Sequence, residues 1–487
     1  MLVPLYIIYI IAIIIALAIA AYLTNPFNRF TIIRRPYIAK MKNGVIKAID
    51  ENKRLVVNQS FFYSGFAVIK NAIHILNSRW HSSPASDATT VEGIMDDIYD
   101  LRFDPTKLLL TSGDHFSALF VRNLGVFYYP TLDAAIPSDE RRWEDRQIVY
   151  IQTLAYALGT FDKLATLKTT IVPTGRYRAT GVNFHAYPSD TMYGMLYALA
   201  ALLGKETAQP VAYGKPLHTL DTLPAAKLLL KTYGESLAQH YWNYRSYAYD
   251  ETAGLVSMQA LMSGAKDITK RQSSFYDNVI FWKTTELAMK LKLIDSDKHF
   301  LSDLKQRILD TFWLDNEGYF LEDLSPEGVS GKYYSSDWLI TLATGFISPT
   351  VAAELSYFTR SVEYIRAMKI DEPFPIKYQH ETRASRQFFI VRLAVAAYGG
   401  DSIWSFWGME YLKVLMILNK QTGDSAYLAL ADRHISTYKH NMLENNGFPE
   451  VYDKNGKLLQ TPLYRSIRQT GWVIGFDQVL AMRNTLD

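Results

Sequence analysis

The feature that most constrains the fold is a regular alternation of two kinds of helical segment along most of the chain. Apolar residues recur at helical spacing, whereas β-branched alternating runs are short and rare. Counted in chain order, the first, third and every further odd segment is amphipathic. The even segments, such as the one that contains residues 191–203, are apolar almost all round, which is typical of a buried helix. The expected helices cover residues 51–78, 112–127, 139–170, 188–204, 223–247, 275–292, 296–313, 335–347, 350–368, 400–419, 424–443 and 466–485.

This alternation predicts an all-α fold in which a ring of buried inner helices is wrapped by a ring of outer helices, an (α/α)6 toroid. The loops that run from an outer helix to the next inner helix are long, at residues 248–274, 314–334, 369–399 and 444–465. Long loops on a rigid scaffold usually carry function. We therefore expect the functional face to be the one where the inner helices begin. Several of these loops also contain hairpin signals, at residues 249–256, 314–320 and 452–457.

The composition favours a large packed core and excludes several kinds of site. Hydrophobic residues make up 49% of the 487 residues, and charged residues 20%. There is no Cys, which excludes disulfides, thiolate zinc sites and Cys nucleophiles. The net charge is only +3, and no basic stripe is interleaved with aromatic residues, so we expect no nucleic-acid partner. No metal-ligand spacing links the His residues, and we expect no metal or other cofactor.

Residues 1–23 contain no charged side chain and are long enough to cross a bilayer as a helix. A cleaved signal peptide is the alternative, but no Lys or Arg precedes the apolar run, which exceeds the usual signal-peptide core of about 7–15 residues. We expect a transmembrane anchor at residues 1–23, a basic juxtamembrane linker at 24–50 and one catalytic domain at 51–487. The basic linker favours a cytoplasmic domain, although large domains can cross a membrane regardless of flanking charge.

Five inner helices begin close to an Asp. Asp is a favoured N-cap residue and suits the positive end of the helix dipole, so capping is one interpretation of each. Capping alone does not explain why an Asp recurs at the start of five inner helices, because the outer helices could be capped equally well and show no such regular Asp. The other interpretation is a group of carboxylates gathered around one mouth of the ring. These residues are Asp114, Asp190, Asp277, Asp337 and Asp401.

Two long loops carry carboxylates that such a ring would place across the mouth from each other. Glycoside hydrolysis needs two carboxyl groups, held about 6.5–9.5 Å apart in an inverting enzyme. Pro449 stiffens the approach to Glu450, although a solvated loop carboxylate is the alternative for any of these residues alone. The loop carboxylates are Asp250, Glu251 and Asp267 on one side and Glu444, Glu450 and Asp453 on the other.

Several short motifs occur in an order that resembles a known family. They are residues 111–122, 188–191, 266–267 with 276–278, 447–450 and 468–472. Over about residues 100–485 the chain resembles the six-hairpin (α/α)6 glycosidases, specifically the glucoamylase and glycogen-debranching amylo-α-1,6-glucosidase group. The resemblance implies the double-ring fold and inverting hydrolysis of α-glucosidic linkages in an oligo- or polysaccharide.

The resemblance also implies roles for individual residues. Asp267 is expected to be the general acid and Glu450 the general base. The debranching enzymes have Trp-Met before their acid, whereas this chain has Ala265 and Lys266, so Asp277 is the substitute acid. Core packing is the favoured interpretation of Trp404, Trp407 and Tyr411, which share a helical face, although Asp401 and Trp404 near the helix start could contact a sugar. The expected substrate-binding residues are Asp114, Arg122, Asp190, Asp277, Asp337, Asp401, Trp404, Gln469 and Trp472.

Two other functions stay open at this point. A polysaccharide lyase or sugar epimerase on the same fold would abstract a proton, and His115, His185 or His380 should then matter. A membrane-tethered carbohydrate-binding scaffold that has lost catalysis is the other alternative, and the residues that precede Asp267 are its best support.

Overall fold

The computed structural model describes residues 41–80, 86–103, 118–125, 140–175, 177–183, 187–206, 222–260, 262–263, 266 and 268–486. Several predictions from the sequence lie outside these residues: the expected membrane segment 1–23, residues 24–40 of the expected linker, Asp114, His115, His185 and Asp267. Within the described part of the chain, no helix combines the length and the apolar character needed to span a bilayer.

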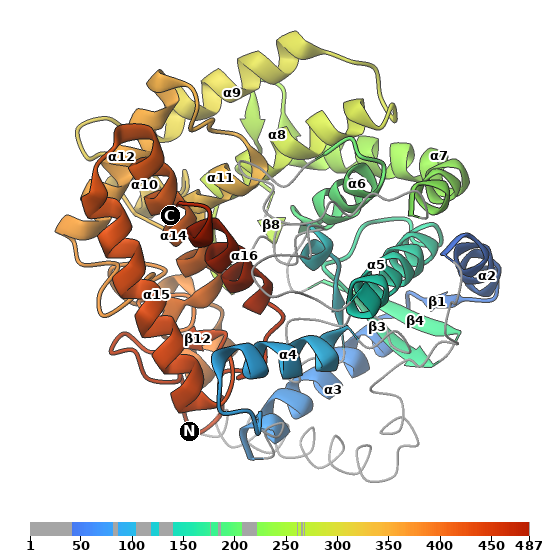
Figure 1. Cartoon of the computed structure of the whole chain (residues 1–487). Coiled ribbons are helices and arrows are strands. Elements are labelled where there is room, and N and C mark those ends of the chain that lie inside the picture. The colour runs from blue at the N-terminus through green and yellow to red at the C-terminus, as the bar shows by residue number, and fades with distance from the viewer. Residues whose placement is uncertain are drawn as a thin grey trace, which may run out of the picture.

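The inner layer is a series of buried helical segments, each packed against the next along the chain (Figure 1). Every residue of α6 is buried, as are most residues of α8 and α14, which explains why these segments are apolar almost all round. The inner segments are η2 (Val121–Leu124), α6 (Thr191–Leu202), α8 (Phe275–Lys290), η4 (Ser336–Leu339) continued by α11 (Ile340–Thr344), α14 (Ser405–Thr422) and α16 (Val473–Asn484).

The outer layer consists of amphipathic helices that bury one face against the inner layer; in Figure 1, α7, α9, α12 and α15 lie at the periphery. The ring closes where α4 packs on α15 and the hydroxyl of Tyr99 in α4 donates to Asp477 in α16 at 2.8 Å. The predicted double ring of helix pairs is therefore confirmed. The outer helices are α4 (Val91–Arg102), α5 (Glu140–Phe161), α7 (Thr222–Ala248), α9 (Lys298–Phe312), α12 (Ala352–Ala367) and α15 (Ser425–Asn445).

The N-terminal part differs from the prediction. The helix expected at 51–78 is confirmed only from residue 61 onward, because the chain forms α2 (Met41–Lys53), strand β1 (Val56–Asn58) and α3 (Phe61–Trp80). Residues 41–50, expected to be linker, thus belong to a helix that packs on α5 and α7. The first outer helix is instead α4, which the sequence analysis missed. Thr90 caps it by accepting from the Gly93 amide, and its buried residues repeat at helical spacing.

Short strands lie in the connections between the helices, so the fold is not purely α-helical. Strands β1, β4 (Arg178–Val182), β3 (Thr170–Gly175) and β2 (Leu119–Phe120) form one sheet in that order, and the helix expected at 139–170 ends at Phe161 before it. The hairpin signals at 249–256 and 314–320 are confirmed as β6 (Tyr249–Asp250) with β7 (Leu255–Val256), and β9 (Trp313–Leu314) with β10 (Tyr319–Phe320).

The predicted long connections from outer to inner helices are confirmed, and they contain further short elements. Strand β5 (Tyr187–Pro188) pairs with β8 (Met262–Ser263), and β11 (Ile403–Trp404) pairs with β12 (Val451–Tyr452). The same connections contain α10 (Pro326–Ser330), η5 (Ala384–Arg386) and α13 (Phe389–Val395). They meet around the starts of the inner helices, which is where the candidate site lies.

Candidate active site at the mouth of the ring

Glu450 lies where the last long loop meets the start of α14. Its amide donates to the carbonyl of Ile467 at 2.9 Å, and its own carbonyl accepts from Ser405, from the amide at 3.1 Å and from the hydroxyl at 2.9 Å. Pairing of Trp404 with Val451 fixes the same junction. The side chain is only 3% exposed. The loop carboxylate is therefore buried and held in place, which removes the solvated-loop interpretation of Glu450.

Aromatic side chains surround Glu450. Burial raises the pKa of Tyr464 well above its usual range, and the adjacent Glu450 carboxylate, to which the Tyr464 hydroxyl is hydrogen-bonded, raises it further. The ring of Tyr464 lies 5.4 Å from that of Tyr398, which lies 4.7 Å from Trp404, and Trp404 lies 5.7 Å from Trp472. A carboxylate in such a water-poor, aromatic setting is suited to acid–base work and to binding beside a flat sugar face.

Asp190 precedes α6 but does not cap it through its side chain. Instead, the Tyr276 hydroxyl donates to Asp190 Oδ2 at 3.1 Å, and Nη1 of Arg122 lies 4.0 Å from the same oxygen. The Arg122 guanidinium also lies over the Phe120 ring, at 4.9 Å from its centroid. The structure thus brings two predicted binding residues, Asp190 and Arg122, together across the starts of three inner segments.

Asp277 does not cap its helix either, because Ser274 caps α8 by accepting from the Asp277 amide at 3.0 Å. The Ser274 hydroxyl donates in turn to Asp277 Oδ2 at 2.6 Å. Burial raises the pKa of the Asp277 carboxyl, and the Arg271 cation together with hydrogen bonds from Ser189 and Ser274 opposes this only in part. A carboxyl with a raised pKa retains its proton more readily, as a general acid must.

Arg271 connects the starts of two inner segments. Its Nη1 lies 2.5 Å from Asp337 Oδ2, with both side chains almost fully buried, and the Tyr378 hydroxyl also donates to that oxygen at 3.4 Å. The same guanidinium lowers the pKa of Asp277 against the effect of burial. Asp337, one of the predicted binding residues, is therefore neutralised by a neighbour. Arg271 was not among the site residues predicted from the sequence.

A second buried ionic cluster contains Lys266, which precedes the expected acid in the sequence. Lys266 Nζ is 2.6 Å from Glu322, which also binds Gln379 at 2.8 Å and Arg386 at 3.1 Å. Burial lowers the pKa of Lys266 to about 8, with Glu322 opposing the shift. Burial alone would raise the pKa of Glu322, but Lys266, Arg386 and Arg271 hold it at about 2. Lys266, the residue before Asp267, is thus fixed inside the protein.

The remaining predicted residues lie on the same loops. Asp401 is partly exposed and accepts from the Thr382 hydroxyl at 2.7 Å, four residues before α14 begins, so it does not cap that helix. Gln469 pairs through its backbone with Phe448, and its carbonyl accepts from Arg102 at 2.8 Å. Trp407 and Tyr411 are fully buried, which confirms core packing for these two residues, and Trp404 and Trp472 are also largely buried.

Ring contacts join the two sides of the mouth. The Tyr276 ring lies 6.4 Å from Trp407, which lies 6.3 Å from Tyr378, and Tyr378 lies 5.1 Å from Trp404. A continuous series of packed aromatic rings therefore connects the Asp190 side with the Glu450 side. Four residues were not predicted from the sequence although they lie in the long loops 369–399 and 444–465: Tyr378, Tyr398, Tyr464 and Arg386. Among the described residues, no three His, Asp or Glu side chains converge as metal ligands.

No protein-family model matches the chain. No curated protein matches it either. Among solved structures, the chain is similar to a rhamnosidase from Klebsiella oxytoca with rhamnose bound, at 11% identity and a TM-score of 0.48 over 82% of this chain and 66% of that one. It is also similar to a glucoamylase from Saccharomycopsis fibuligera, at 12% identity and a TM-score of 0.47 over 83% of this chain and 98% of that one.

A third similar structure is a cellobiose 2-epimerase from Spirochaeta thermophila, at 11% identity and a TM-score of 0.48 over 81% of this chain and 98% of that one. The chain thus spans just under two thirds of the rhamnosidase and nearly the whole of the other two proteins. The resemblance stated from the sequence named the glucoamylase group, and a glucoamylase is among these similar structures.

Proposed function

We propose that the protein is an inverting glycoside hydrolase, anchored in a membrane by residues 1–23, that cleaves α-glucosidic linkages of an oligo- or polysaccharide. The observation that carries the proposal is the setting of Glu450. Its side chain is 3% exposed, its backbone is fixed to the start of α14, and Tyr464 and the Trp404 ring cluster lie around it. In this role the carboxylate accepts a proton from the water that attacks the anomeric carbon.

The general acid is one of two carboxyl groups. The family resemblance assigns the role to Asp267, whose neighbour Lys266 is buried against Glu322. Burial and the raised pKa of Asp277 support that residue as the alternative. In either case the carboxyl protonates the glycosidic oxygen as the bond to the anomeric carbon breaks, and the leaving sugar departs as an alcohol. The water oxygen bonds to the opposite face of the anomeric carbon, so the configuration inverts.

The sugar is held by the polar and aromatic groups around the same mouth. Carboxylates accept hydrogen bonds from sugar hydroxyls, guanidinium groups donate to them, and indole rings stack on the apolar faces of pyranoses. We assign this role to Asp114, Arg122, Asp190, Asp337, Asp401, Trp404, Gln469 and Trp472, with Asp277 joining them if Asp267 is the acid.

The test is to purify the full chain in detergent, supply α-linked gluco-oligosaccharides and follow the released sugar and its anomeric form by NMR. We expect the β-anomer to appear first, Glu450→Gln to abolish release, and either Asp267→Asn or Asp277→Asn to reduce it by orders of magnitude. Glu444→Gln is the matched control, because Glu444 is a carboxylate near the same loop. Release of the α-anomer would contradict inversion. Glu450→Gln at near-full activity would contradict the assigned base.

The same experiment separates the alternatives left open by the sequence. An epimerase would convert the sugar without releasing a glycoside fragment, and activity would then depend on a His. His380 is the described candidate: burial and the nearby Arg383 cation lower its pKa to about 4, so it is neutral at pH 7. Loss of activity in His380→Ala with retention in Glu450→Gln would favour that function. Binding without any turnover would favour the non-catalytic scaffold.

The proposal also includes the side of the membrane on which the catalytic domain lies. We place the catalytic domain on the cytoplasmic side, because the residues that follow the apolar segment are basic. Protease treatment of intact cells tests this placement, since a cytoplasmic domain survives until the membrane is permeabilised.

A further inference from the structure

Helix α3 exposes large apolar side chains on one face. Phe62, Phe66 and Ile69 lie at positions i, i+4 and i+7, so they share a helical face, and Phe62 is 84% exposed. Tyr63 and Val68, on the flanks of this face, are also exposed. Single exposed hydrophobic residues are normal, but a contiguous apolar stripe along a helix marks an interaction surface. We call Phe62, Phe66 and Ile69 the α3 stripe.

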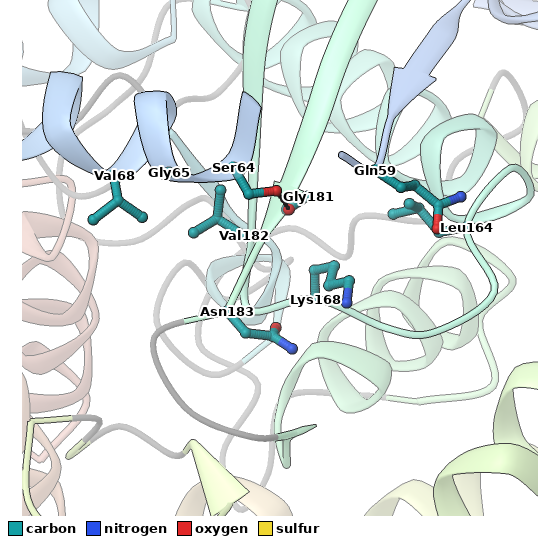
Figure 2. Close-up of a pocket in the computed structure, with 9 residues that line it drawn as sticks. All are labelled: Gln59, Ser64, Gly65, Val68, Leu164, Lys168, Gly181, Val182 and Asn183. Carbon is teal, nitrogen blue, oxygen red and sulfur yellow. Dashed lines mark hydrogen bonds between the residues drawn. The ribbon is translucent and has the colours of Figure 1, made fainter. Parts of the chain in front are cut away.

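The opposite face of α3 packs on the protein, and the described side chains at its centre, Ser64 and Ala67, are small. Ala67 is buried against Phe120, Val172 and Val182 of the four-stranded sheet. Figure 2 shows Ser64 of α3 beside strand β4, at the wall of a cavity of about 340 Å³. A helix that served only the fold would bury its large apolar residues and expose its small ones. Here the arrangement is reversed.

The charge of α3 indicates the kind of partner. The helix contains no Asp or Glu in its 20 residues, whereas Lys70 and Arg79 are basic. The preceding linker adds Arg29, Arg34 and Arg35. Apolar and aromatic side chains on one face, combined with basic and no acidic groups, are typical of helices that lie in the interface of an anionic lipid bilayer.

The position of α3 in the chain fits the same partner. The apolar run ends at Leu23, and residues 24–40 separate it from α2, which leads through the short strand β1 into α3. An extended chain of that length reaches at most about 60 Å. A domain tethered by residues 1–23 therefore stays within that distance of the lipid surface, where an apolar helix face would meet headgroups repeatedly.

We propose that the α3 stripe is a second membrane contact, which inserts Phe62, Phe66 and Ile69 into the interface of an anionic bilayer and orients the domain on it. This inference rests on the proposed anchoring by residues 1–23. The anchor alone would leave the domain free to rotate about its linker. Two separate attachments fix which face of the ring points along the membrane.

The absence of Cys from the chain allows a direct test. Single variants Phe62→Cys, Phe66→Cys and Ile69→Cys of the full chain are labelled with bimane and placed, one copy per nanodisc, in phosphatidylcholine and phosphatidylglycerol. Doxyl-labelled lipid and aqueous iodide are then compared as quenchers. Val351→Cys is the matched control, because Val351 is an exposed aliphatic residue, 46% accessible, on the outer helix layer.

We expect doxyl lipid to quench the three stripe positions by at least half while iodide quenches them weakly, and the reverse at position 351. Stripe labels quenched by iodide as strongly as position 351 would overturn the proposal. Labels shielded from both quenchers would also overturn it, since another part of the chain would then cover the stripe. Co-elution of the unlabelled chain with the discs reports the anchor separately. A chain that stays in the disc with iodide-accessible stripe labels contradicts only the α3 contact, whereas a chain that leaves the disc contradicts the anchor and with it this inference.

Discussion

Ser405 and Glu450 are joined by two hydrogen bonds, in which the Ser405 amide and hydroxyl donate to the Glu450 carbonyl at 3.1 and 2.9 Å. Ser405 is the first residue of α14, so the candidate base is tied to a rigid inner helix although it lies on a loop. The adjoining strands β11 and β12 pair over only two residues each. The Ser405 contacts therefore carry much of the positioning of Glu450.

We predict that Ser405→Ala lowers kcat several-fold with little change in KM. The substitution removes one of the two hydrogen bonds, and the net stabilisation from such a bond is about 0.5–1.5 kcal/mol. The amide still holds the carbonyl, so the fold should survive while Glu450 gains freedom. Urea unfolding and initial rates measure both effects. Ser356→Ala on the exposed face of α12 is the control, because its hydroxyl makes a comparable contact with the Ala353 carbonyl at 2.7 Å. A wild-type kcat in Ser405→Ala would contradict the positioning role.

The buried cluster around Glu322 predicts a dependence of stability on pH. The pKa of Glu322 is lowered from 4.5 to about 2 in the folded protein, so the unfolded chain binds more protons between these values. Its stabilising contribution is therefore present above pH 4.5 and is lost as pH falls toward 2. Glu322→Gln leaves Lys266 and Arg386 without their buried carboxylate and should cost about 3–5 kcal/mol at pH 7.

The slope of unfolding free energy against pH, measured between pH 4.5 and the lowest pH at which the protein still folds, should be shallower in Glu322→Gln than in the wild type. Glu317→Gln is the matched control, because Glu317 pairs with Lys332 at 2.6 Å on the surface, where such pairs contribute about 0–1 kcal/mol. Equal costs for the two substitutions would show that burial does not strengthen the Glu322 interactions.

The helix layers could be predicted from the sequence because their signal is local. Residues 191–203 are apolar on every side, which requires burial, and the structure places α6 in the inner layer. The first outer helix was missed because α4 is short and follows an apolar stretch, 61–80, that looks like a better outer helix. The four-stranded sheet was missed because β1 pairs with β4, more than a hundred residues away, and short strands have no strong periodicity.

The candidate site, like the fold, has features that could be predicted from the sequence and features that could not. Pro449 before Glu450 is visible in the sequence, whereas the burial of Glu450 beside Tyr464 was not predicted and is known only from the structure. The partners of the charged groups could not be predicted, because they come from loops far apart in the chain. Arg271 pairs with Asp337 across 66 positions, and Lys266 pairs with Glu322 across 56. No spacing rule connects residues that only the closure of the ring brings together.

The contact between Ser274 and Asp277 provides a test of which carboxyl is the acid. The Ser274 hydroxyl donates to the Asp277 carboxylate at 2.6 Å, which favours the ionised form. Ser274→Ala removes this donor, so the pKa of Asp277, already raised by burial, should rise further. If Asp277 is the acid, the alkaline limb of the pH–activity profile should move to higher pH by a few tenths of a unit. An unchanged limb would assign the acid to Asp267. Helix capping is also lost, at about 1 kcal/mol, so stability is measured in parallel.

We predict that Asp371 couples the loop 369–399 to helices α14 and α15. Its carboxylate is buried, accepts from the Tyr411 hydroxyl of α14 at 3.1 Å and lies 3.7 Å from Nε2 of His434 in α15. Burial alone would raise the pKa of Asp371, but His434 and Tyr411 lower it below 3.8. The resulting stabilisation is present above pH 3.8 and is lost as pH falls below that value.

Asp371 thus ties the start of the loop that carries Gln379 and Arg386 to two helices. Asp371→Asn should cost about 2–3 kcal/mol, because hydrogen bonds to a charged group are lost or weakened. Tyr411→Phe should cost less, and the two substitutions together should cost less than the sum of the single ones, with a coupling of about 0.5–3 kcal/mol. Urea unfolding of the four proteins at pH 7 measures this coupling. Strict additivity would mean that the hydroxyl contributes nothing through Asp371, and the loop would then be held by His434 and its backbone contacts alone.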